Sequence, residues 1–187
     1  LSWYSTEHNL DAYALFNMLY AVTKKDIYRR EMERTFKWLK ENTYSPKEGR
    51  LIRGKGDATI ATDTLAWAVA AIGPERLMKE GMDPDAMMKF AEDHCLVSTQ
   101  LTRPDGEVVN IKGFDFAKAR NVARNGIVST EWTSQMILSY KQMADFYRKL
   151  QDTAKADEYA AKAELYLNEL DKMIMSSSSP SGQGAGC

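Results

Sequence analysis

The segment Ser5-Thr6-Glu7-His8-Asn9-Leu10-Asp11-Ala12-Tyr13 opens a helical pattern in a way that recurs twice further along the chain. In each copy a hydroxyl residue is followed at once by a carboxylate and then by a largely apolar run. The other two copies are Ala61-Thr62-Asp63-Thr64-Leu65-Ala66-Trp67 and Ser129-Thr130-Glu131-Trp132-Thr133-Ser134-Gln135. A hydroxyl side chain caps free backbone N–H groups, and a carboxylate in the first turn interacts favourably with the helix dipole. Each copy therefore predicts the start of a helix.

Working outward from these starts, the apolar periodicity predicts six helices. We expect them at 6–22, 26–41, 58–72, 84–97, 130–150 and 153–175. The first, third and fifth are apolar on nearly all sides, which is typical of buried helices, whereas the second and sixth have one apolar and one charged face. This alternation predicts an all-α fold of three antiparallel helical hairpins in two layers, with the odd-numbered helices inside. Leu15, Val69 and Leu138 should then be more buried than Ile27 and Leu167.

The rest of the chain fits one helical domain over residues 1–175. The Ser/Gly-rich residues 176–187 have the composition of a loop or linker. Residues 107–111 alternate in polarity and could form a small hairpin arm. The carboxylates of the three motifs lie 56 and 68 residues apart (7 to 63, 63 to 131). These spacings do not fit the 34-residue repeat of tetratricopeptide arrays, and they favour hairpins joined by loops of variable length.

Composition excludes several functional classes. The 187 residues carry a formal net charge of -1, so there is no basic excess to neutralise phosphates, and we predict no nucleic-acid partner. The two cysteines, Cys95 and Cys187, exclude a disulfide scaffold and a cysteine-rich zinc module. His94 and Cys95 have no second ligand pair at metal spacing, so we predict no metal or cofactor. The sequence contains no run of 18 apolar residues, so it predicts no membrane-spanning helix.

Three features of the repeated motif favour a site over helix caps alone. Carboxylates stand at the ends of otherwise apolar helices, Glu7 and Asp11 share one face one turn apart, and aromatic residues cluster at the same ends. Carboxylates bind hydroxyl groups, and flat aromatic rings stack on sugar rings, so the pattern predicts a carbohydrate site. The candidate binding residues are His8, Asn9, Asp11, Trp67, Glu131 and Trp132. Helix capping remains the alternative for each single motif.

The three motifs, in this order and on these helices, resemble the six-hairpin glycosidases of bacteria. The resemblance spans about 5–175 and implies an (α/α)6 toroid with its active site in a central funnel, at the N-terminal ends of the inner helices. It also implies a carbohydrate substrate and acidic residues that act as general acid and base on a glycosidic bond. The family has six hairpins and this chain supplies three. We therefore expect a partial toroid, the remaining hairpins to lie outside this chain, and uncovered apolar surface along the first and fifth helices.

Glycoside hydrolysis needs two carboxyl groups, which stand about 5 to 9 Å apart across the scissile bond. Glu7 and Asp63 are the first choices because they open adjacent inner helices, and Asp11 and Glu131 are the reserves. One of the pair must keep its proton, which burial promotes. We expect Glu7 to be that group, shielded by Trp3, Tyr4 and Tyr13.

Other functions remain open at this point. The main alternative to a glycoside hydrolase, or a related lyase, is a non-catalytic helical module that binds glycan or protein through its concave face. Another enzyme on an α/α toroid, such as a sugar epimerase or a terpenoid-type cyclase, is a third hypothesis, because one fold hosts many functions.

The segment Gly54-Lys55-Gly56-Asp57 lacks the spacing of a phosphate-binding loop, so it predicts a solvated turn. The sequence does not decide the compartment, the glycan or the linkage.

Overall fold

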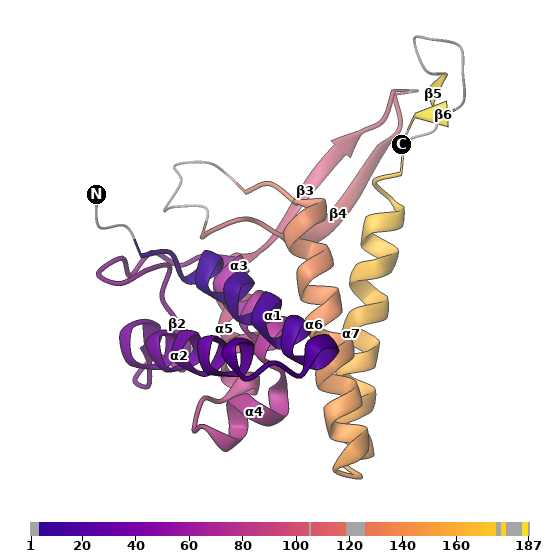
Figure 1. The fold of residues 1–187 in the computed structure, drawn as a ribbon. Coiled ribbons are helices and arrows are strands. Elements are labelled where there is room, and N and C mark those ends of the chain that lie inside the picture. Colours follow the sequence, from indigo (N-terminus) through magenta and orange to yellow (C-terminus); the bar gives the residue numbers. More distant parts are fainter. Residues whose placement is uncertain (1–3, 105, 119–125, 175–176, 179–184, 187) are drawn as a thin grey trace.

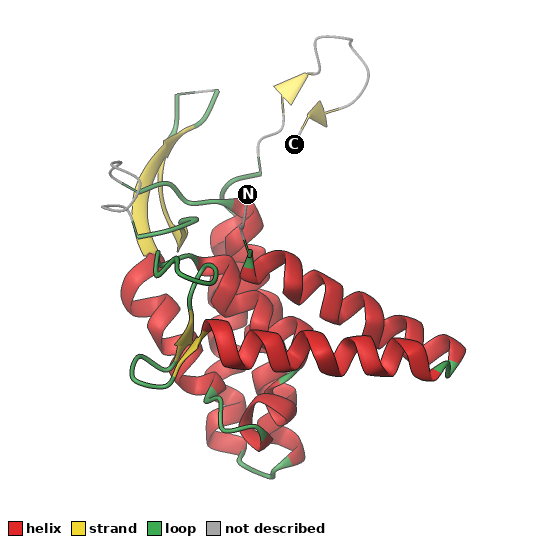
Figure 2. Cartoon of the chain, turned by 60° about the vertical axis from the view of Figure 1, so that its left-hand side comes forward, coloured by secondary structure: helices red, strands yellow, loops and turns green. Residues whose placement is uncertain are grey.

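Helices dominate the computed structural model of the chain, which describes residues 4–104, 106–118, 126–174, 177–178 and 185–186 (Figures 1 and 2). The expected fold of helical hairpins is confirmed. The helices are α1 (Thr6–Thr23), α2 (Asp26–Thr43), α3 (Thr62–Ile72), α4 (Pro74–Lys79), α5 (Pro84–Cys95), α6 (Thr130–Lys149) and α7 (Thr153–Asp171). The strands are β1 (Tyr44–Ser45), β2 (Arg50–Leu51), β3 (Leu96–Thr102), β4 (Val108–Phe114), β5 (Ser177–Ser178) and β6 (Ala185–Gly186). They form three antiparallel pairs, β1–β2, β3–β4 and β5–β6.

Several boundaries differ from the prediction. The third helix begins at Thr62 rather than at 58, and the last ends at Asp171 rather than at 175. The fourth was expected to run to 97 but ends at Cys95, because Leu96 turns extended and pairs with Phe114. The short helix α4 was missed altogether. Its six residues are too few to show a helical period, although proline at its first position is a recognised start signal.

Helix α3 lies at the centre of the molecule. It packs against α1, α5 and α6, while α2 pairs with α1 and α7 pairs with α6 (Figure 1). Leu65, Ala66, Ala68 and Val69 are all at most 1% exposed, as expected for a helix covered on every side. None of the described helices is both long and apolar enough to cross a lipid bilayer.

The predicted burial order is right for Val69 in α3, wrong for Leu15 in α1 and mixed for Leu138 in α6, which is less exposed than Ile27 but more exposed than Leu167. Val69 is fully buried, but Leu15 is 53% exposed and Leu138 is 44% exposed, against 45% for Ile27 and 38% for Leu167. The physical reason is that α1 and α6 flank α3, so each has a side that no described element covers. Figure 2 shows the α1–α2 hairpin extending away from the other helices.

The uncovered apolar surface that was expected is present. On α1 it forms a stripe of Leu15, Met18 and Val22, which are 53%, 65% and 84% exposed. These residues recur at helical spacing and continue the face that carries Asp11 one turn earlier and Glu7 two turns earlier. On α6 the exposed apolar residue is Leu138. An apolar stripe of this kind marks a face that can pack against a partner.

Candidate functional site

The N-terminal ends of α1 and α3 lie side by side and point the same way. Trp67 donates a hydrogen bond from Nε1 to Oδ1 of Asp11 over 2.7 Å, across 56 residues of sequence. Glu7 and Asp63 are separated by the same 56 residues, and their carboxyl groups interact by charge and by a hydrogen bond. The spacing of the sequence repeat is therefore also the register in which the two helices pack, and it brings four predicted site residues together.

A pocket of about 560 Å³ opens at these helix ends. Its walls come from the start of α1, the loop before α3, the first turn of α3 and the segment after β4. The lining residues are Tyr4, Ser5, Glu7, His8, Arg53, Gly54, Lys55, Gly56, Asp57, Asp63, Thr64 and Phe116. Acidic, basic and aromatic side chains thus share one concave space, and a concave space with convergent polar groups is the usual place for a ligand.

The loop before α3 is fixed to the start of α1 by its backbone. Thr6 donates from its backbone N–H to the carbonyl of Arg53 over 2.9 Å, and Lys55 donates to the carbonyl of Tyr4 over 3.1 Å. A Cβ atom on Gly54 would lie 2.6 Å from the same Tyr4 carbonyl oxygen, closer than real contacts allow. Glycine is therefore required at this position, because only its backbone can approach α1 so closely.

The segment that follows β4 joins the starts of α3 and α6. Thr62 donates from its backbone N–H to the carbonyl of Phe116 over 2.8 Å, and from Oγ1 to the carbonyl of Asp115 over 2.6 Å. Ser129, which precedes α6, donates to the carbonyl of Phe114 over 3.0 Å. These bonds hold the Phe116 ring in the pocket wall. The ring of Trp132 lies 4.9 Å from it, centroid to centroid.

Asp63 is the carboxyl group whose protonation is most strongly altered at this site. Its residue is 4% exposed, and burial is the main reason that its pKa rises to about 6. The negative charge of Glu7 and the hydrogen bond between the two carboxyl groups raise it further, whereas the N–H of Thr64, 2.6 Å from Oδ1, acts in the opposite direction. The expectation that Glu7 is the buried member of the pair is therefore wrong. Glu7 is exposed and Tyr4 is itself 50% exposed, and Trp3, which was also expected to shield Glu7, lies outside the described residues.

Asp57 lines the same pocket, and its pKa is shifted in the opposite direction. Its hydrogen bonds with Thr59 are the main cause that holds its pKa below the ordinary value, and the cation of Arg53 adds to the effect. The backbone N–H of Thr59 donates to Oδ1 over 3.0 Å, and Arg53 Nη1 lies 3.8 Å from Oδ2. The pocket therefore combines a carboxyl group that retains its proton up to about pH 6 with one that stays ionised well below that pH.

The remaining predicted residues fall into two groups. His8 lines the pocket, and Trp132 approaches it through Phe116. Asn9 and Glu131 do not line it. The Asn9 side chain donates to the carbonyl of Ser5 over 2.7 Å, as a local stabiliser of the helix start, and Glu131 is exposed in the first turn of α6.

Sequence reasoning missed the loop side chains that complete the pocket, Arg53, Lys55, Asp57 and Phe116. The only signal was the Gly54-Lys55-Gly56-Asp57 motif, which was interpreted as a solvated turn and in fact forms one wall. Among the described residues, no cluster of three or more histidine, cysteine or acidic side chains is placed to hold a metal ion.

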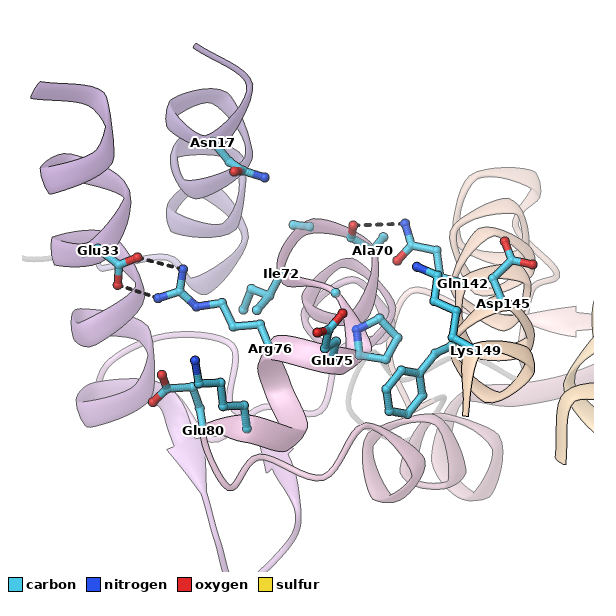
Figure 3. Close-up of a pocket in the computed structure, with 15 residues that line it drawn as sticks. Asn17, Glu33, Ala70, Ile72, Glu75, Arg76, Glu80, Gln142, Asp145 and Lys149 are labelled. Atoms are coloured by element: carbon cyan, nitrogen blue, oxygen red, sulfur yellow. Dashed lines mark hydrogen bonds and ion pairs between the residues drawn. The ribbon is translucent and has the colours of Figure 1, made fainter. Parts of the chain in front are cut away.

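A second pocket, of about 780 Å³, lies at the opposite ends of the same helices (Figure 3). It is bounded by Asn17 of α1, Ile72 at the end of α3 and Lys149 at the end of α6. Arg76 spans one wall and is fully engaged, with two bonds to Glu33 and the Phe36 ring 4.1 Å from its guanidinium carbon. Arg76 is thus held by structural contacts, and the contact between Glu7 and Asp63 lies at the other end of the helices.

Comparison with known proteins supports the fold. The sequence matches no protein-family model and no curated protein sequence. A solved structure described as polysaccharide lyase BACCELL_00875 superposes with a TM-score of 0.58 at 14% sequence identity, over 97% of this chain and 51% of that chain. The chain thus spans about half the length of that lyase. At this sequence identity the similarity establishes a shared helical fold. The reaction has to be argued from the residues of the site.

Proposed function

We propose that this chain carries the acidic part of a glycan-cleaving active site, most consistent with a glycoside hydrolase. The observation that carries the proposal is the contact between Glu7 and Asp63 at the mouth of two parallel helices, in a pocket of about 560 Å³. A carboxyl pair that shares one proton is suited to general acid catalysis near neutral pH. A helix cap alone does not require a second carboxyl group from a neighbouring helix.

The contact between Glu7 and Asp63 changes the roles that the sequence suggested. Two carboxyl groups in direct contact leave no room for a glycosidic bond between them, which needs about 5 Å or more. We therefore treat them as one unit. Asp63 holds the proton in the free site and passes it across their hydrogen bond to Glu7. The exposed Glu7 faces the substrate and donates this proton to the glycosidic oxygen as the bond to the sugar breaks, which leaves the pair without its proton until a new one is taken from water.

Asp57 is the candidate for the second catalytic carboxylate. It remains ionised in the same pocket, so it can take a proton from an attacking water molecule or stabilise a positively charged sugar ring. Its loop is fixed to α1 by the Gly54 contacts, which would keep it at a constant place relative to Glu7. A general base must be held at a constant position relative to the reacting groups.

A sugar ligand fits the rest of the pocket. The Phe116 ring lies in the wall beside Trp132, and aromatic rings supply the flat apolar surface on which sugar rings stack. His8, Ser5 and Tyr4 add hydroxyl and imidazole groups for hydrogen bonds with sugar hydroxyls. The similar structure is described as a polysaccharide lyase, so this fold also occurs in a protein that acts on glycans.

Elimination is the second candidate reaction. The specific observation in its favour is that Tyr4 and His8, which can accept a proton, line the same pocket as the cation Arg53. In that reaction a base removes the proton next to a sugar carboxylate, the cation stabilises the carbanion, and the glycosidic oxygen leaves as a double bond forms. Hydrolysis and elimination both release a reducing end, but only elimination creates an unsaturated sugar.

A panel of polysaccharides and oligosaccharides tests the proposal. Reducing ends and the ultraviolet absorbance of unsaturated sugars are measured in parallel on the purified protein. We expect glycan cleavage, and we expect Glu7→Gln and Asp63→Asn each to lower kcat by about 10²–10⁴-fold with smaller changes in KM. Glu131→Gln, at the start of α6 and outside the pocket, is the matched control. If both pocket variants turn over their best substrate at the wild-type rate, these residues are caps or sugar ligands.

A further inference from the structure

The wall opposite the start of α1 carries two cations that the acid chemistry leaves unused. Arg53 and Lys55 flank the buried Gly54 and both line the pocket. The turn that carries them is closed by reciprocal backbone bonds, from Gly54 to the carbonyl of Asp57 and from Asp57 to the carbonyl of Gly54. Their backbone positions are therefore fixed relative to Glu7, although neither side chain takes part in proton transfer.

The guanidinium of Arg53 is positioned but incompletely paired. Its Cζ atom lies 5.7 Å from the centre of the Phe116 ring, and its closest carboxylate oxygen, Oδ2 of Asp57, is 3.8 Å from Nη1. That separation is too long for a hydrogen bond. Within the part of the chain that the structure describes, no acceptor lies within hydrogen-bond distance of this guanidinium, and Lys55 makes no ion pair. Two cations held at a pocket wall with free N–H donors can bind an anion.

We infer that Arg53 and Lys55 recognise a carboxylate on the sugar that occupies this pocket, so that the substrate is a uronate-containing glycan. The inference rests on the proposed function and specifies its substrate class. The planar guanidinium fork matches the two oxygens of a carboxylate, and Lys55 adds a point charge. The Phe116 ring is adjacent to Arg53, so a sugar stacked on it lies beside the cations.

The charged groups in the pocket also limit the negative charge that a bound anion can carry. Glu7 and Asp57 are carboxylates in the same space, and they repel a ligand with two or more negative charges. A phosphate monoester or a polyphosphate is therefore disfavoured, whereas a single carboxylate adds one charge against two cations. A neutral sugar offers no charge to pair with Arg53 and therefore gains less from this wall than a carboxylate does.

Binding spectra of the purified protein test the inference independently of turnover. The probes are methyl glucuronide and methyl galacturonide, with methyl glucoside and methyl galactoside as matched neutral sugars and sulfated glucose as the other monoanion. We expect uronides to shift the proton–nitrogen signals of Lys55 and Gly56 in a saturable way, and to bind at least about tenfold more tightly than the neutral sugars. Raised salt should weaken uronide binding and leave neutral sugars unaffected.

Four variants assign the effect. Arg53→Gln should lower uronide affinity by about tenfold and Lys55→Gln by less, while Lys25→Gln, an exposed lysine that precedes α2, should change nothing. Arg53→Lys keeps the charge without the fork and should be intermediate, which guards against a folding defect in the glutamine variant. Equal binding of neutral and uronide sugars, tighter binding of the sulfated sugar, or unchanged uronide binding by Arg53→Gln would each overturn the inference.

The two proposals fail in distinguishable ways. If uronides bind through Arg53 but no glycan is cleaved, the site recognises acidic sugars and the catalytic proposal is wrong. If neutral glycans are cleaved with the expected loss in Glu7→Gln, and uronides gain nothing from Arg53, the catalytic proposal stands and this inference is wrong.

Discussion

Asp11 accepts the indole N–H of Trp67 over 2.7 Å, one helical turn beyond the contact between Glu7 and Asp63. The two contacts form successive links between α1 and α3, and each joins residues that are 56 positions apart. The link between Asp11 and Trp67 involves only an exposed aspartate and a half-buried indole, so its role is to fix how α1 and α3 align. The link between Glu7 and Asp63 involves a buried carboxyl group.

The register link predicts a measurable coupling between its two side chains. Trp67→Phe and Asp11→Ala should each lower the free energy of unfolding, and the double variant should lose less than the sum by about 0.5–1.5 kcal/mol, the usual value of one hydrogen bond. Denaturant titration of the four proteins measures this energy. Asp26→Ala, which removes an exposed partner of Arg29, is the control. Strictly additive losses would show that the hydrogen bond does not set the register.

The raised pKa of Asp63 predicts a pH dependence of stability. Because the folded state binds this proton up to about pH 6 and an unfolded aspartate releases it near pH 3.8, the folded state holds more protons between these values. Stability relative to Asp63→Asn should therefore be greatest below pH 3.8, fall as the pH rises through this window, and level off above pH 6. The total loss should be at most about 3 kcal/mol.

Glu7→Gln provides the control for that measurement. It removes the neighbouring negative charge but leaves Asp63 buried, so the pH window should narrow from its upper end without disappearing. Denaturant titrations at a series of pH values measure the window for the three proteins. An identical pH profile in wild type and Asp63→Asn would contradict the assignment of the proton to Asp63.

A second set of contacts fastens α5 to the α6–α7 hairpin through Asp85. Tyr147 and Tyr159 both donate their hydroxyl hydrogen bonds to its carboxylate, and Lys155 lies 3.4 Å from it. Asp85→Ala leaves both tyrosine hydroxyls without their acceptor and should destabilise the fold by about 1–3 kcal/mol.

Asp93 on the same helix is the matched control for Asp85. It pairs with Lys89 at the surface, so Asp93→Ala should cost no more than about 0.5 kcal/mol. Thermal and denaturant unfolding of both variants decide the matter. Equal effects at the two positions would mean that the tyrosine contacts contribute nothing specific.

The pocket wall depends on the absence of a side chain at residue 54. Gly54→Ala would place a Cβ atom against the Tyr4 carbonyl, and the loop must move away from α1. We expect faster hydrogen exchange at the N–H groups of Thr6 and Lys55, and a loss of stability above that of the control. Gly56→Ala is that control, because a Cβ there meets no atom within 4 Å and the change costs only the strain of a positive φ, about 1–2 kcal/mol.

The sequence predicted the helices and half of the site for identifiable physical reasons. Caps at Ser5 and Ser129 and the apolar run of α3 are local signals, and they located three helix starts to within a few residues. The repeat spacing correctly paired Glu7 with Asp63. It could not tell which of them is buried, because the burial of Asp63 comes from α3 being covered on both sides, which is a property of the whole assembly.

The remaining misses have the same cause. Arg53 and Phe116 reach the pocket through backbone bonds to residues about 50 positions away, and no periodic pattern encodes such a contact. Leu15 was predicted to be buried because its helix is apolar, but α1 lies at the edge of the described structure. Composition measures how apolar a helix is and does not reveal how many neighbours it has.

The bonds that join Phe116 to Thr62 and Arg53 to Thr6 also determine when the pocket can exist during folding. The α1–α2 and α6–α7 hairpins are closed by contacts between adjacent helices, which form early because little chain must be ordered first. The pocket needs contacts across 46 to 56 residues, from Thr6 to Ile52 and from Trp67 to Asp11, and their loop-closure entropy delays them. The helical signal should thus recover before the Asp63 pocket closes, and a refolding chain would pass through a helical state without its site.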